Sequence, residues 1–176
     1  AEQTDKEGNL VYLYANSKEE QYAYIQAAEA KGYSVLLLDG QLDAPLVSQL
    51  EQKWEKTRFV RVDGDTPERL IPKKDEAVNE EDQAANENLT SVFNAVLPQV
   101  EKAQFHVETS AMGAASAPVL ITQSEYMRRM KETARLQPGM SFYGEMPDMY
   151  SLVLNTDHPL VKQVGEGVMS ATGEKL

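Results

Sequence analysis

Three short apolar runs, separated by segments with helical spacing, organise the first part of the sequence. The runs cover residues 10–14, 33–38 and 58–62, and each has the length and the polar borders of a strand. Between them, apolar positions recur every three or four residues, as in amphipathic helices. The pattern predicts a βαβαβ order, with parallel strands joined by right-handed crossovers. The second run is apolar enough to be covered on both faces, whereas the third alternates like a half-exposed edge strand.

The pattern changes in the middle of the chain, where acidic side chains follow two lysines and almost nothing is apolar. Such a stretch is either a solvated linker or the exposed start of a helix. We therefore predict one domain over residues 1–72, an acidic connector over 73–88 and a second domain over 89–176.

The second domain mixes helices and strands. Apolar spacing predicts a helix from Leu89, and alternation predicts strands at residues 104–109, 117–121 and 150–155. We take the first two of these strands as partners, joined by a loop of small residues. The third strand would complete a mainly antiparallel sheet.

The remaining elements of this domain are two helices. Thr122 and Glu125 have the spacing of a capping box and open a predicted helix over residues 122–136. Asp157 is placed to cap a last, short helix. The predicted fold class is thus α/β followed by α+β. A small three-layer domain with a short parallel sheet precedes a mixed domain that has a three-stranded, mainly antiparallel sheet and an amphipathic, methionine-rich helix.

Composition narrows the possible partners. Hydrophobic residues make up 41% of the 176 and charged residues 26%, which is typical of soluble globular proteins. The formal net charge of −11 disfavours nucleic acid and anionic membranes as partners, and no apolar run is long enough to span a membrane. The absence of cysteine excludes disulfides and thiolate chemistry and fits a cytoplasmic location.

A search for chemistry finds weak candidates only. The two histidines, His106 and His158, have no metal-ligand spacing, and a structural or solvent-facing role is favoured for both. Ser110 and Ser116 stand among small residues without the strand-turn-helix context of a nucleophile. The residues predict no catalytic group, no metal ligand and no cofactor site.

One alternative stays open at the carboxyl ends of the parallel strands, where α/β sheets bind ligands. Asp39, Asp63 and Asp65 follow the second and third strands and could bind a metal ion or a small ligand. The first two of these aspartates precede glycine, and Asp-Gly is also ordinary turn chemistry. Asn16 follows the first strand without the glycines of a phosphate loop.

Soft apolar side chains gather between residues 127 and 149. The chain has 7 methionines, and this stretch also contains aromatic residues; its apolar members include Met127, Met130, Met140, Phe142, Tyr143, Met146 and Met149, with Tyr126 directly before it. In the helix, Tyr126 and Met130 share a face. A core stripe is favoured from the residues alone, and an adaptable binding surface is the other interpretation.

Several segments, taken in order, resemble one family. They are residues 10–17, 30–33, 35–39, 42–43, the acidic connector, 89–97, the strand pair at 104–109 and 117–121, 122–130 and 154–161. Their order is similar to the distal middle domain and the start of the C-terminal dimerisation domain of the bacterial ninety-kilodalton heat-shock chaperones, the high-temperature protein G group. The similarity covers nearly the whole chain, and the order of the segments carries it because no single motif is diagnostic.

The resemblance implies a fragment of an ATP-dependent, homodimeric chaperone that binds non-native client proteins. It implies that ATP and Mg²⁺ belong to a domain upstream of Ala1, so that this fragment is not itself an enzyme. It also implies that the terminal dimer helices would follow Leu176, which makes dimerisation by the fragment weak or absent.

The family also implies a client surface on a helix with apolar side chains four residues apart. Tyr126 and Met130 match that spacing, and Met127 adds apolar area. The loop residues Met140, Phe142 and Tyr143 complete the predicted client-binding set. An aromatic residue of the family's middle domain has no counterpart here, because Ala44 and Pro45 stand at that point.

Overall fold

The computed structural model describes residues 3–40, 42–71, 80–136 and 146–173. The chain divides into two compact units, Ala1–Lys74 and Asp75–Leu176, and each is treated separately below. Within the described ranges, no helix has the length and apolar character needed to cross a membrane.

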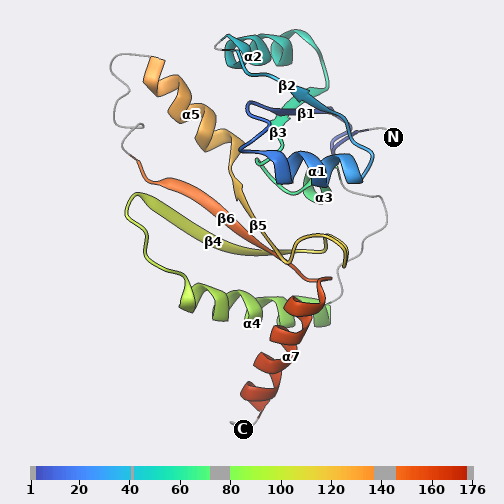
Figure 1. Ribbon diagram of the computed structural model, residues 1–176, viewed down its shortest axis with the longest axis vertical. Helices are drawn as coiled ribbons and strands as arrows, with labels where there is room; N and C mark the ends of the chain where they lie inside the picture. Colours follow the sequence, from blue (N-terminus) through green and yellow to red (C-terminus); the bar gives the residue numbers. More distant parts are fainter. Residues whose placement is uncertain (1–2, 41, 72–79, 137–145, 174–176) are drawn as a thin grey trace. The chain divides into compact units, whose positions relative to one another are not determined.

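The first unit is built on a parallel sheet in the order β2-β1-β3. Its elements, in chain order, are β1 (Leu10–Ala15), α1 (Tyr22–Ala30), β2 (Val35–Leu37), α2 (Asp43–Lys53), β3 (Thr57–Arg61) and α3 (Pro67–Leu70) (Figure 1). In the central strand, Leu13 pairs with Val35 on one side and with Val60 on the other. The predicted parallel βαβαβ arrangement is confirmed.

Two hydrophobic clusters use the two faces of this sheet. On one face, Leu13 packs with Ala28 of α1 and Val60 of β3. On the other face, Phe59 packs with Val47 of α2. Because neighbouring residues of a strand point to opposite faces, one strand contributes to both clusters. The result is a three-layer unit with the sheet between helices.

The prediction that the second strand is covered on both faces is wrong. Leu36 is 42% exposed and Leu37 is 43% exposed, in a three-residue strand at one edge of the sheet that pairs only with β1 among the described strands. An apolar run indicates a strand, but it does not distinguish a central position from an edge.

The second unit contains a mixed sheet in the order β4-β6-β5. Its elements are α4 (Glu80–Val96), β4 (Ala103–Ser110), β5 (Val119–Gln123), α5 (Glu125–Leu136), β6 (Asp148–Asn155) and α7 (Pro159–Gly173) (Figure 1). A core of Leu89, Val107, Leu154 and Val161 joins the two helices α4 and α7 to the sheet.

The predicted pairing of this sheet is wrong. β4 and β5 do not pair with each other: β6 lies between them, parallel to β4 and antiparallel to β5. The sheet is therefore mixed rather than mainly antiparallel. In β6, Val153 and Leu154 are completely buried, as expected for the central strand, which has a hydrogen-bonded neighbour on each side.

Helix boundaries also differ from those predicted. α4 begins at Glu80, so the second half of the acidic stretch is helical, while residues 72–79 lie outside the described ranges. Thr122 is 3% exposed and pairs with Ser151 in the sheet, so it does not cap the next helix, which begins at Glu125. α7 spans 15 residues and is not short.

Candidate functional site

The predicted binding helix is α5, and the structure gives its apolar residues different environments. Tyr126 is 69% exposed, whereas Met127 and Met130 are half-buried. The core interpretation therefore does not fit Tyr126. The other predicted members, Met140, Phe142 and Tyr143, lie outside the described residues.

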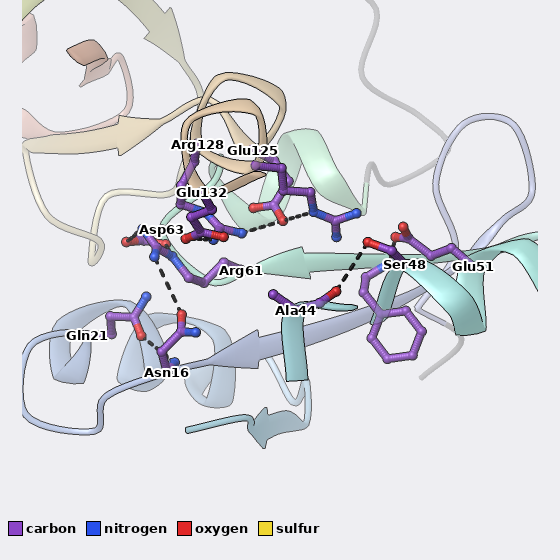
Figure 2. A network of polar contacts seen from close by, with 12 residues as sticks. Asn16, Gln21, Ala44, Ser48, Glu51, Arg61, Asp63, Glu125, Arg128 and Glu132 are labelled. Carbon is purple, nitrogen blue, oxygen red and sulfur yellow. Dashed lines mark hydrogen bonds and ion pairs between the residues drawn. The ribbon is translucent and has the colours of Figure 1, made fainter. Parts of the chain in front are cut away.

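A charged part of α5 is buried instead. The side chain of Arg128 is 6% exposed, and its guanidinium donates to Glu125 Oε1 and to Glu132 Oε1 at 2.6 Å each. Arg129 Nε also donates to Glu125 Oε1, at 2.7 Å. Figure 2 shows Arg128 with Glu125 and Glu132. Buried charges are tolerated when they are paired in this way.

Helical geometry explains how the two kinds of residue coexist. Successive residues of an α-helix are about 100° apart around its axis, so Arg128 lies about 160° from Tyr126, measured the short way round. Ala134, buried at 5% exposure, lies about 80° from Tyr126 by the same count. α5 is thus amphipathic in an unusual sense, because a charged residue is buried while an aromatic one is exposed.

The pairing also changes the acidity of Glu125. Burial alone would raise the pKa of this carboxyl group, but the hydrogen bond and charge of Arg128, helped by Arg129, outweigh it and lower the pKa below 4.5. The ionised form of Glu125 is therefore stabilised in the folded protein.

The lowered pKa predicts acid sensitivity of α5. Because the folded pKa lies below the unfolded one, the stabilisation is complete above about pH 4.5 and is lost as the pH falls through the folded value. Glu125→Gln should remove this pH dependence. Amide hydrogen exchange in α5, measured on parent and variant across this range, checks the prediction. Equal responses of the two proteins would contradict it.

A buried asparagine at the end of β6 was missed by the sequence analysis. Asn155 is completely buried. Its Oδ1 accepts from the backbone N–H groups of Met112 and Asp157, at 3.0 and 3.1 Å, and its Nδ2 donates to the carbonyls of Gly113 and Ala117, at 2.9 and 3.1 Å. One side chain therefore fixes the small-residue loop between β4 and β5 to the start of the segment before α7.

Two features make this loop depend on its partners. Gly113 has φ of +87°, a conformation that favours glycine, and its N–H donates to Asp157 Oδ2 at 2.8 Å. Asp157 was predicted as a helix cap but binds this loop instead. A polar residue at the end of an apolar strand, as in Leu154-Asn155, is the sequence signal that could have identified the site.

The alternative ligand site is not supported. Asp63 binds Arg61 through two contacts of 2.5 and 2.8 Å (Figure 2). Asp65 Oδ1 accepts from the Thr66 N–H at 2.7 Å, and Asp39 is exposed. In the part of the chain that the structure describes, no group of three or more His, Cys, Asp or Glu side chains could hold a metal ion.

The carboxyl end of β1 is filled by the protein itself. Gln21 is 5% exposed, and its Oε1 accepts from the N–H groups of Asn16 and Ser17, at 2.8 and 3.2 Å. Figure 2 shows Gln21 directed at Asn16. Adjacent N–H groups at such a position could bind an anion, but here a side-chain amide oxygen already occupies them.

The two histidines lie in different elements of the second unit. His106 is exposed on β4. His158 Nδ1 accepts from the Leu160 N–H at 3.2 Å, in the first turn of α7.

Comparison with known proteins gives a consistent answer. The family model described as "Hsp90 protein" matches residues 2–175. "Chaperone protein HtpG" of Bacteroides thetaiotaomicron is 60% identical over 162 residues, and that of Porphyromonas gingivalis is 55% identical over 165 residues. These alignments cover 92% and 94% of this chain but 24% of each relative, so the chain spans about a quarter of their length. The resemblance is confirmed: the chain belongs to the Hsp90 protein family, in its bacterial HtpG group.

Proposed function

We propose that this chain supplies a client-contact surface to an ATP-dependent chaperone, and that Tyr126, Met127 and Met130 of α5 are part of that surface. The observation that carries the proposal is the 69% exposure of Tyr126 on a helix that buries an arginine. An exposed aromatic side chain beside half-buried methionines suits a binding surface better than a core.

The chemistry of these side chains fits partners of varied sequence. Methionine is unbranched and polarisable, so it adapts its shape to irregular apolar partners. Tyrosine offers a large apolar ring with a polar end. A surface of this kind binds exposed apolar segments of non-native proteins without sharp specificity. The net charge of −11 argues against nucleic acid and anionic membranes as partners.

The role of the whole protein is part of the proposal, because the chain spans only 24% of its relatives. In the whole protein we assign residues 1–72 to the middle domain, 73–88 to a connector and 89–176 to the dimerisation domain. ATP and Mg²⁺ bind in another domain, which hydrolyses ATP, so the fragment carries neither the cofactors nor the ATPase site. The whole protein is a cytoplasmic homodimer, and the fragment alone dimerises weakly or not at all.

The client surface is tested by replacing Tyr126 and Met130, the two apolar residues of α5 that stand four residues apart. Tyr126→Ser combined with Met130→Ser is expected to weaken binding of an unfolded client about tenfold, since two apolar contacts are lost at the contact surface. Stability should change little at the exposed Tyr126. Binding is measured by fluorescence anisotropy of a labelled, permanently unfolded protein.

A matched control uses Tyr22, which is 63% exposed on α1 in the other unit. Tyr22→Ser should leave client affinity unchanged. Unfolding of the double variant, together with the absence of client-induced NMR shifts at residues 126–130 in the parent, would return α5 to the core interpretation and reject the proposal.

A further inference from the structure

The connection between α5 and the sheet of the second unit includes an ion pair. Lys131 Nζ lies 2.6 Å from Asp148 Oδ1. The lysine side chain is 13% exposed and the aspartate side chain 40%. The contact joins the middle of α5 to the first residue of β6. It therefore links the helix directly to the sheet.

Asp148 is itself held in place by the backbone. Its N–H donates to the Lys102 carbonyl at 2.8 Å, and in the sheet it lies beside Ala103 of β4. The backbone of Asp148 is thus fixed at the start of the central strand. The ion pairs of Arg128 with Glu125 and Glu132 differ in kind, because both partners belong to α5 and stiffen the helix without joining it to β6.

The position of Lys131 around the helix determines what the ion pair does. At about 100° per residue, Lys131 lies about 140° from Tyr126. A tether on that side turns Tyr126 away from the point of attachment.

We propose that Lys131 is a positioning residue for client binding, because its ion pair with Asp148 holds α5 with the exposed Tyr126 directed outward. This inference rests on the proposed function of α5. It adds a property that the apolar residues alone do not have: the orientation of the client surface depends on ionic strength.

The expected size of the effect follows from the exposure of the pair. Salt weakens an ion pair to the extent that solvent and counterions reach it, and the Asp148 side chain is 40% exposed. Loss of the pair should therefore weaken client binding about three- to fivefold rather than abolish it. It should also speed amide exchange in α5, since the helix would be less firmly attached.

The test uses the 176-residue chain and its Lys131→Met variant, which keeps the apolar stem and removes the charge. The binding probe is a blocked, uncharged synthetic peptide of leucine, serine and glycine, so that salt cannot act on the probe's own charges. Affinity and amide exchange in α5 are measured at low and high salt. Lys162→Met, at an exposed lysine of α7, is the matched control.

Rescue separates positioning from a general packing role. The double variant Lys131→Glu with Asp148→Lys restores opposite charges in the reverse order. We expect it to bind the peptide within about twofold of the parent and to regain the salt dependence, whereas Lys131→Met binds weakly at every salt concentration.

Two results would overturn the inference, and they are distinguishable from each other. If the parent binds the peptide and Lys131→Met matches it in affinity, salt response and α5 exchange, the ion pair does not position the helix while the proposed function stands. If the parent does not bind the peptide at all, the proposed function fails and the role of Lys131 in client binding fails with it.

Discussion

Asn155→Ala is expected to lower the free energy of unfolding of the second unit by about 3–5 kcal/mol, one of the two largest effects we predict. The side chain satisfies four backbone groups through one buried and three partly buried hydrogen bonds, and a buried group left without a partner costs about 1–3 kcal/mol. The cost is less than the full sum because the loop can relax and admit water.

Asn155→Asp sharpens this prediction, because it keeps the shape and the acceptor while removing the donor. A carboxylate oxygen would then face the carbonyls of Gly113 and Ala117, so the loss should be at least as large as for alanine. Asn94→Ala, at an exposed position of α4, should change stability by less than about 0.5 kcal/mol. The stability of each variant is measured by urea denaturation and by amide hydrogen exchange in β4 and β6. Equal stability of the Asn155 and Asn94 variants would show that the hydrogen bonds of Asn155 contribute nothing to the stability of the second unit.

The second large effect is expected in the first unit, where Leu13→Ala should cost about 3 kcal/mol, as for other buried leucines replaced by alanine. Leu13 is 1% exposed in the central strand, between neighbours on both sides, so the cavity cannot easily collapse. The surrounding cluster includes Val60 and Ala28.

Trp54 makes this loss easy to follow. It is the single tryptophan of the chain, and its ring centroid lies 6.3 Å from that of Phe59, within the first unit. The urea midpoint of its fluorescence should fall in Leu13→Ala and stay unchanged in Leu42→Ala, where the side chain is 79% exposed. A shift of the same size in both variants would contradict the role of burial.

The parallel sheet of the first unit could be predicted because the patterns that indicate its strands and helices each lie within a short segment of sequence. Each strand is a short apolar run, each helix has its own periodicity, and βαβ connections permit essentially one handedness. The exposure of Leu36 and Leu37 could not be predicted in the same way. It depends on what covers each edge strand, because β3 is also an edge strand and yet buries Phe59 and Val60.

The strand pairing predicted for the second sheet is wrong because alternation along a strand does not identify the strand's neighbour. β4 and β5 follow each other in the sequence, and sequential strands usually pair. β6 instead lies between them and carries the fully buried Val153 and Leu154. The hydrogen-bonding role of Asn155 depends on that central position, so it was missed together with the pairing.

The candidate site was identified by residue type but not by orientation. Helical spacing shows that Tyr126 and Met130 share a face. It does not show that Arg128 is buried, because the burial of a charge depends on partners such as Glu125 and Glu132. The usual rule that apolar faces point inward therefore gave the wrong preference for Tyr126.

The central place of β6 has a consequence for the order in which the protein is made. Synthesis on the ribosome runs from the N-terminus, so β4 and β5 emerge before the strand that pairs with both of them. Until residues 148–155 leave the exit tunnel, both strands keep open backbone edges that other chains can bind. The three described strands of the first unit have been made by then, because they precede Lys74. The nascent chain therefore carries the strands of the first unit beside an unfinished second sheet, and β6 then covers one open edge of β4 and one of β5.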